Sequence, residues 1–194
     1  MQKFIRVRAV AAPLPLANVD TDMIIPARFM KLLTRDGLGA HLFEELRFGP
    51  DGHERADFIL NRPGCREAQI LIADRNFGCG SSREHAVWAL GGFGIRCVIA
   101  PSFGDIFAGN ARKNGLLLIR LPEAACEHLR REIEQAQFAP IEIDLEAQQI
   151  ALTSGETIAF AVDADDRRIL MEGLDDIGRT LLHKDAIARF EAAA

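Results

Sequence analysis

The chain has 194 residues, of which 48% are hydrophobic and 26% are charged, and its formal net charge is −5. This size and balance indicate one folded unit with a sizeable core, and the lack of a clustered run of Lys and Arg argues against nucleic acid as a partner. Because no apolar stretch approaches the roughly 20 residues that span a bilayer and the N-terminus lacks a signal-peptide hydrophobic region, we expect no membrane association and a cytoplasmic location.

The first third of the chain predicts one strand and then a long connection. Residues 4–10 alternate weakly in hydrophobicity, which is typical of a strand, and a proline-containing loop follows at residues 12–16. Short helices are predicted over Ala27–Leu33 and near residues 41–46. Because the sequence around them is rich in Gly, Asp, Arg and Pro, we expect a mobile loop or flap over residues 27–64.

After residue 68 the pattern becomes regular. Short apolar strands alternate with helices, which predicts βαβ units, a parallel sheet and ligand binding near the carboxyl ends of its strands. The expected order is strand 69–74, helix 82–91, strand 96–100, helix 103–113, strand 116–121 and helix 123–136. Three short strands are expected between residues 141 and 162. A helical C-terminal tail over residues 165–194 is expected to form two helices that break near Gly173.

Cysteine and histidine spacing gives no sign of a metal site. The four cysteines lie far apart without a C-x-x-C pair, and the five histidines form no H-x-x-x-H spacing. Zinc and iron–sulfur sites need several such ligands close together. We therefore expect no metal and no cofactor on this chain.

The segment Gly78–His85, which reads GCGSSREH, lies where a predicted strand meets a predicted helix. Its glycines allow positive φ and a close approach of the backbone to a ligand. Free N–H groups at a helix start, together with Arg83, favour a carboxylate or a phosphate. Ser81 and Glu84 also fit the capping box S-x-x-E, which needs no function. Arg83 is unfavourable in a first helical turn, and this favours the functional interpretation.

Asn76–Ala86, together with Asp20–Pro26 upstream, resembles the signature of the swivelling domain of the aconitase superfamily. This fuller pattern looks like that of the bacterial 3-isopropylmalate dehydratase small subunits. The likeness extends over nearly the whole chain, including Ala100–Phe103 and Asn114–Leu117. It implies an α/β fold, namely a three-layer swivelling β/β/α domain with a mixed, partly barrel-like sheet, as a single domain over residues 1–194.

The resemblance implies a hydro-lyase of leucine biosynthesis, which moves the hydroxyl of 2-isopropylmalate to the neighbouring carbon through an alkene. It implies that Ser81 is the catalytic base and that Arg83 stabilises the alkoxide and binds a substrate carboxylate bidentately. Ser82 would bind the same carboxylate and stays an alternative for the base. A [4Fe–4S] cluster is implied on a separate large subunit, so that the active site would be completed at the interface of a heterodimer.

The segment Arg28–Leu32 corresponds to the recognition segment of the family. Met30 and Leu32 favour an isopropyl group, whereas Arg28 and Lys31 suit a third carboxylate. Besides Ser82, the candidate substrate-binding residues are therefore Arg28, Phe29 and Met30.

Simpler interpretations of several residues stay open. Phe29, Met30 and Leu33 also fit a helix stripe that packs in the core. Asp20 and Asp22 fit turn or cap positions better than a catalytic carboxylate pair, because nothing in the sequence places them beside the serines.

Two other functions fit parts of the sequence. The same chemistry serves 2-methylmalate, citraconate or homoaconitate in related hydro-lyases, and a kinetic comparison with isopropylmalate would separate them. A noncatalytic phosphate or nucleotide module would use the Gly-x-Gly turn alone, although no Gly-Lys-Ser/Thr motif follows.

Overall fold

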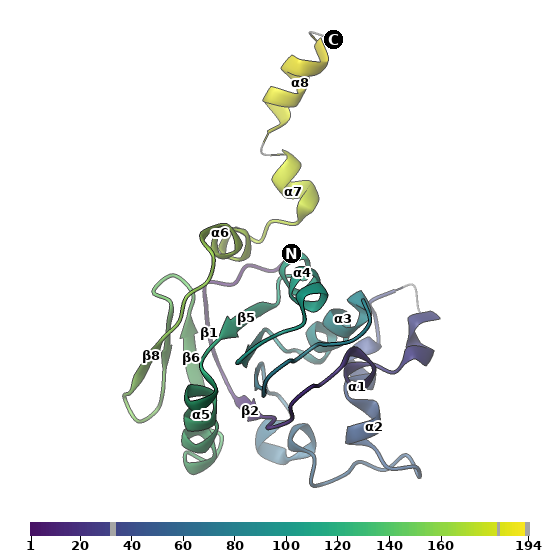
Figure 1. Ribbon diagram of the computed structural model, residues 1–194, viewed down its shortest axis with the longest axis vertical. Coiled ribbons are helices and arrows are strands. Elements are labelled where there is room, and N and C mark those ends of the chain that lie inside the picture. The colour runs from purple at the N-terminus through teal and green to yellow at the C-terminus, as the bar shows by residue number, and fades with distance from the viewer. Residues whose placement is uncertain (32–33, 182, 193–194) are drawn as a thin grey trace.

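Two four-stranded sheets form the strand framework of the computed structural model, which describes residues 1–31, 34–181 and 183–192 (Figure 1). One sheet is parallel, with the order β2-β3-β4-β5, and the other is antiparallel, with the order β1-β6-β7-β8. The parallel strands are β2 (Ala11–Pro13), β3 (Ile70–Ile72), β4 (Cys97–Ala100) and β5 (Leu117–Arg120). The antiparallel strands are β1 (Arg6–Ala9), β6 (Ile141–Asp144), β7 (Gln149–Ala151) and β8 (Thr157–Ala159).

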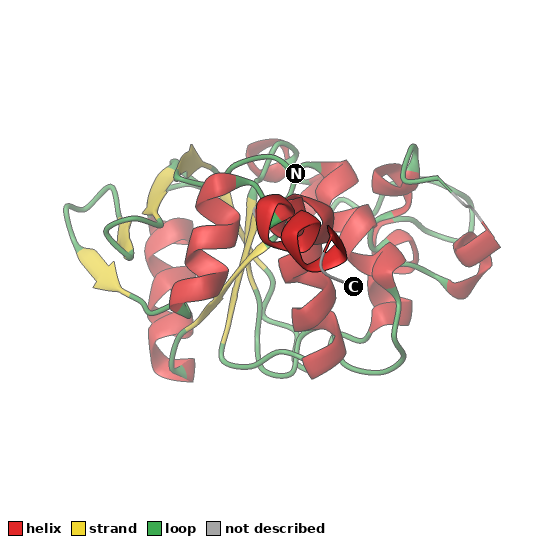
Figure 2. Cartoon of the chain, turned by 90° about the horizontal axis from the view of Figure 1, so that it is seen from above, coloured by secondary structure: helices red, strands yellow, loops and turns green. Residues whose placement is uncertain are grey.

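The parallel sheet is buried on both faces, and this produces three layers. The face that carries Leu71 packs under α3 (Glu84–Phe93) and α4 (Asp105–Asn114). The opposite face, which carries Ile70, packs in a second core with α5 (Glu123–Gln135) and the antiparallel sheet. Burial on both faces explains the continuous apolar runs of these strands, and Figure 2 shows helices on both sides of them. The expected three-layer α/β fold is confirmed.

The N-terminal segment differs from its prediction. Residues 4–10 were expected to form one strand before a loop, but β1 pairs with β6 whereas β2 pairs with β3, so the chain passes from one sheet to the other at Val10. Pro13 ends β2, an edge strand, where a residue without an N–H is tolerated. Because parallel and antiparallel strands are thus separated, the expected mixed, partly barrel-like sheet is two sheets.

The connection between the first strands and β3 contains several short helices. They are α1 (Thr21–Ile24), η1 (Ala27–Lys31), η2 (Leu38–His41), α2 (Glu44–Arg47), η3 (Ile59–Asn61) and η4 (Pro63–Cys65), where η denotes a 3₁₀ helix. Leu38 and Phe43 are fully buried, so the middle of this connection is anchored to the core. Leu32 and Leu33 lie outside the described residues. The mobility expected for residues 27–64 stays a prediction.

The C-terminal tail contains α6 (Ala164–Glu172), α7 (Asp176–Leu181) and α8 (Lys184–Ala192), where two helices were expected. Gly173, with a φ of 69°, ends α6 at the predicted break. Figure 1 shows α7 and α8 projecting from the body of the molecule. Among the described residues, no helix has the length and apolar character needed to cross a membrane.

Candidate active site

A glycine turn leads from the segment after β3 into α3. Gly78 and Gly80 have φ values of 73° and 86°, in the left-handed region that favours glycine. At Gly78 a Cβ would also lie 2.2 Å from the ring of Phe107. The Thr21 N–H donates to the Cys79 carbonyl at 3.0 Å. This bond fixes the turn against the start of α1.

Ser81 and Ser82 are exposed between this turn and α3. The predicted capping box is wrong, because α3 begins at Glu84 and its N-cap is Arg83, with no side-chain cap. Thr21 donates its hydroxyl to the Ser81 carbonyl at 3.0 Å and holds the chain outside the helix, while Glu84 accepts from an asparagine of α4 at 2.9 Å. The Ser81 hydroxyl therefore makes no hydrogen bond with any described residue and is available to a ligand.

Arg83 is held largely inside the protein, with 9% of its side chain exposed. Its Nη2 donates to Asp22 Oδ2 at 2.6 Å, and its Nη1 forms an ion pair with the other carboxylate oxygen. Arg83 holds the pKa of the Asp22 carboxyl below its ordinary value. The buried Nε has no hydrogen-bond partner among the described residues. The guanidinium therefore keeps a donor for a further acceptor.

Asp20 and Asp22 both lie beside the glycine turn, but they have different roles. Asp20 is the N-cap of α1, and its Oδ1 accepts from the Met23 N–H at 2.8 Å, which confirms the cap prediction for this residue. Asp22 is not a simple turn residue, because it binds Arg83, which is 61 residues further along the chain. No local pattern signals this pairing.

The segment η1 begins at Ala27, five residues after Asp22 in the chain. Met30 is 42% exposed, which rules out a core stripe for this residue. Phe29 packs partly against the core and stacks on His41, with ring centroids 4.0 Å apart.

The structure thus brings the predicted serines and Arg83 against α1, which precedes the predicted recognition segment. Arg28, in contrast, is already engaged by two carboxylates of α2, Glu44 and Glu45. Asp22, which links these parts, was missed as a site residue by sequence reasoning.

The described cysteines are not paired with one another, and they do not gather with other possible metal ligands. Within the described parts of the chain, no three His, Cys, Asp or Glu side chains are grouped to hold a metal ion. Cys65, Cys97 and Cys126 are buried, and burial raises the pKa of the Cys65 and Cys126 thiols to about 11. Cys79 is partly exposed in the glycine turn.

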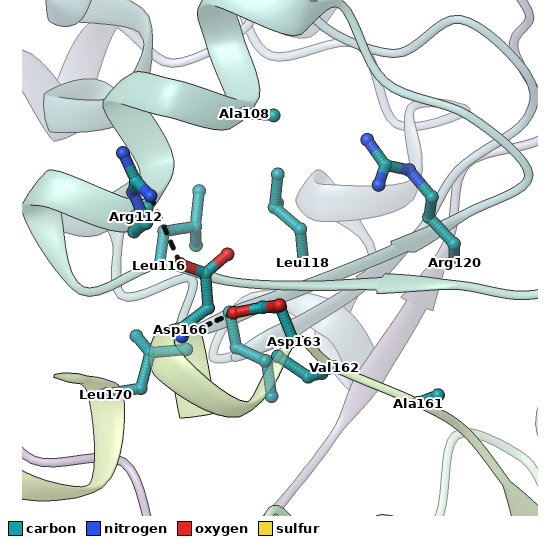
Figure 3. Close-up of a pocket in the computed structure, with 11 residues that line it drawn as sticks. Ala108, Arg112, Leu116, Leu118, Arg120, Ala161, Val162, Asp163, Asp166 and Leu170 are labelled. Carbon is teal, nitrogen blue, oxygen red and sulfur yellow. Dashed lines mark hydrogen bonds and ion pairs between the residues drawn. The ribbon is translucent and has the colours of Figure 1, made fainter. Parts of the chain in front are cut away.

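A pocket of about 150 Å³ lies between α4, β5 and α6, apart from the glycine turn (Figure 3). Its polar lining is Arg112, Arg120, Asp163 and Asp166, and Arg112 forms an ion pair with Asp166 at 3.4 Å. Neither the serines nor Arg83 line this pocket. Ser81 and Ser82 therefore lie on the exposed surface, outside this pocket.

The fold and the glycine turn define a class of protein. Residues 1–124 match the family model described as Aconitase C-terminal domain, and residues 127–164 match the model described as LeuD_N. The chain is 28% identical to a solved structure of 3-isopropylmalate dehydratase (leuD) from Methanocaldococcus jannaschii, with a TM-score of 0.71, and the match covers 95% of this chain and 99% of that chain. This is a domain of the aconitase class.

Closer relatives specify the family. The chain is 55% identical over 191 residues to the 3-isopropylmalate dehydratase small subunit of Granulibacter bethesdensis, covering 98% of this chain and 91% of the relative. It is 55% identical over 194 residues to the small subunit of the same name from Jannaschia sp., covering 100% of this chain and 96% of the relative. The chain belongs to the family of 3-isopropylmalate dehydratase small subunits. A small subunit implies a large-subunit partner.

Proposed function

We propose that this chain is the small subunit of a 3-isopropylmalate dehydratase, a hydro-lyase of leucine biosynthesis. It supplies the catalytic base and the arginine that binds a substrate carboxylate. The observation that carries the proposal is an exposed Ser81 beside a largely buried Arg83 whose Nε has no partner among the described residues. A buried guanidinium donor without an acceptor is costly unless a ligand satisfies it. A carboxylate is the ligand that an arginine binds best in this way.

The proposed reaction moves a hydroxyl between neighbouring carbons without net oxidation. In dehydration, Ser81 as an alkoxide takes a proton from the carbon next to a carboxylate, and hydroxide leaves the neighbouring carbon to give an alkene. In rehydration, hydroxide adds to the carbon that lost the proton, and Ser81 returns its proton to the other carbon. Arg83 binds the carboxylate next to which negative charge develops.

A serine hydroxyl is a weak acid, so the surroundings must favour its alkoxide. The charge of Arg83 acts in this direction. Asp22 offsets part of the Arg83 charge but fixes the direction of the guanidinium. We therefore assign Asp22 as a positioning residue and Arg83 as a catalytic residue.

The departing hydroxide needs an acid that the glycine turn does not supply. Because the described residues gather no ligand group for a metal, we place the [4Fe–4S] cluster on the large subunit, where it would act as the Lewis acid. The substrate, a hydroxy dicarboxylate, would then lie between the two subunits of a heterodimer. The exposure of Ser81 and Ser82 on this chain supports such an interface.

Reconstitution with a cluster-bearing large subunit tests the proposal. We expect Ser81→Ala to lower kcat for 2-isopropylmalate by about 10²–10⁴-fold while the subunits still associate, because a proton acceptor is lost. Arg83→Lys should lower kcat/KM, since a lysine cannot bind a carboxylate bidentately. The measurements are steady-state kinetics and sedimentation of the complex.

Ser82→Ala is the matched control, because it removes a neighbouring exposed hydroxyl. We expect it mainly to raise KM. A large loss of kcat in Ser82→Ala with full turnover in Ser81→Ala would move the base to Ser82. Full turnover in both variants would contradict the proposal.

A further inference from the structure

The helices α7 and α8 form a tail that leaves the body of the molecule after α6 (Figure 1). The start of this tail is fixed, because the N-terminal ammonium of Met1 donates to the Gly173 carbonyl at 3.0 Å. Ile169 and Leu170 of α6, just before Gly173, are buried. In contrast, every residue of α8 is exposed. The body therefore holds the beginning of the tail but does not cover its last helix.

Apolar side chains are concentrated on this tail. Of the eight large apolar side chains that are exposed in the described chain, four lie in α7 and α8, and they are between 38% and 77% exposed. Ile177 and Leu181 are four residues apart in α7, and Ile187 and Phe190 are three residues apart in α8. Residues at these spacings share one face of a helix. These four residues are here named the apolar tail face.

The two helices are too short to be stable by themselves. α7 has six residues and α8 has nine, whereas isolated helices shorter than about 12–15 residues are marginal in water. Most helical stability in proteins comes from the packing of an apolar face. Because α8 buries none of its residues against the body, its helix needs a second surface that covers the apolar tail face.

A second copy of this chain is a poor occupant of the apolar tail face. A stable interface uses about 20–30 residues on each side, so four side chains supply too little area for two tails to hold a dimer. Residues 174–194 include four acidic and three basic residues, and this balance gives no strong attraction to a charged partner. The apolar tail face therefore suits an arm that adds to a larger interface.

Contacts connect the start of the tail to the start of α3. Asn114 of α4 donates to Glu84, the first residue of α3, at 2.9 Å. The next residue, Gly115, lies against Met1, because a Cβ there would be 3.0 Å from the Met1 Sδ, and the Met1 ammonium in turn holds Gly173. The exposed serines come just before Glu84 in the chain. The tail therefore begins near the surface where the proposed function places the subunit interface.

We propose that the apolar tail face docks in an apolar groove of the large subunit, as a second contact region of the complex that is separate from the substrate site. The inference rests on the large-subunit partner of the proposed function. Because the tail and the serine surface belong to one chain, docking of one raises the effective concentration of the other. The tail increases the affinity of the subunits and takes no part in the chemistry.

The test uses the complete small subunit and the large subunit, and it measures the dissociation constant of their complex. Ile187→Ser/Phe190→Ser should raise this constant at least about tenfold, because two buried apolar contacts are lost. The value of kcat at saturating large subunit should change less than about twofold, since neither residue contacts the substrate. In the wild type, hydrogen exchange of the α8 amides should be slower in the complex than in the free small subunit.

Asp185→Ser/Arg189→Ser is the matched control. Both residues are exposed and lie on the face of α8 opposite Ile187 and Phe190. This variant introduces the same two serines into the same helix, and it should leave the dissociation constant within about twofold of the wild type.

Equal dissociation constants for the two double variants would overturn the inference. So would a free small subunit that sediments as a dimer and becomes a monomer in Ile187→Ser/Phe190→Ser, because a second copy would then occupy the apolar tail face. A wild-type complex that forms but does not turn over 2-isopropylmalate would contradict the proposed function alone, since the docking of the tail is measured by association. Wild-type subunits that do not associate would contradict both.

Discussion

At the scale of single residues, Asp22 connects α1 to Arg83 in the candidate active site. Its carboxylate accepts from the Arg83 guanidinium, although 57% of its side chain is exposed. A hydrogen-bonded cation favours the charged form of a carboxylate. Asp22 therefore stays ionised across the neutral pH range and keeps Arg83 beside the glycine turn.

The pKa of Asp22 provides a direct prediction. Because its pKa in the folded chain is lowered below the ordinary 3.8, the ion pair with Arg83 is fully present above pH 3.8 and is lost as pH falls through the lower folded value. We expect an NMR titration of the Asp22 carboxyl carbon to give a pKa below 3.8, and Arg83→Gln to raise it.

Asp144 is the control for this titration. Its pKa is also lowered, by a hydrogen bond from the Ala147 N–H and by Arg6, and neither contact involves Arg83. The Asp144 pKa should therefore stay low in Arg83→Gln. An Asp22 pKa that does not change in this variant would show that the ion pair is absent in solution.

At the scale of the secondary-structure elements, η2 packs closely against α3, the helix that follows Arg83. A Cβ at Gly39 of η2 would lie 2.1 Å from the carbonyl carbon of Gly92 in α3. Because α3 begins directly after Arg83, the separation of these two elements affects the position of the glycine turn.

Gly39→Ala should lower the free energy of unfolding by about 1–3 kcal/mol or more, because the new methyl group collides with backbone atoms that have no room to move. Denaturant unfolding of the small subunit measures this loss. Gly91→Ala is the matched control on α3, since a Cβ there meets nothing within 4 Å. It should be neutral or stabilise the helix by up to about 1 kcal/mol. Equal effects of the two substitutions would contradict the close packing.

At the scale of the whole molecule, local patterns predict the βαβ core and the glycine turn. The strands before α3 and α4 are recognisable as short apolar runs. The run from Gly78 to Arg83 is recognisable by its turn-forming glycines and its arginine. The pairs Arg83–Asp22 and Arg28–Glu44 carry none, because their partners are 61 and 16 residues apart and meet only in the folded chain. The sequence also does not indicate that the chain passes from one sheet to the other at Val10, because the strands on both sides of Val10 bury apolar residues.

The whole molecule also presents half of an active site. Its proposed base is exposed, the arginine proposed to bind the substrate carboxylate is largely buried, and its family implies a partner subunit. The central claim is that Ser81 removes and returns the substrate proton, whatever the partner contributes to the departing hydroxide.

Isotope transfer tests this claim most directly. The reconstituted complex is incubated with 2-isopropylmalate that carries deuterium on its methylene carbon, and removal of that deuterium is followed by NMR, whether it then appears in the product or in water. We expect removal in the wild type and in Ser82→Ala, and a rate about 10²-fold or more lower in Ser81→Ala. Removal at the wild-type rate in Ser81→Ala would contradict the account.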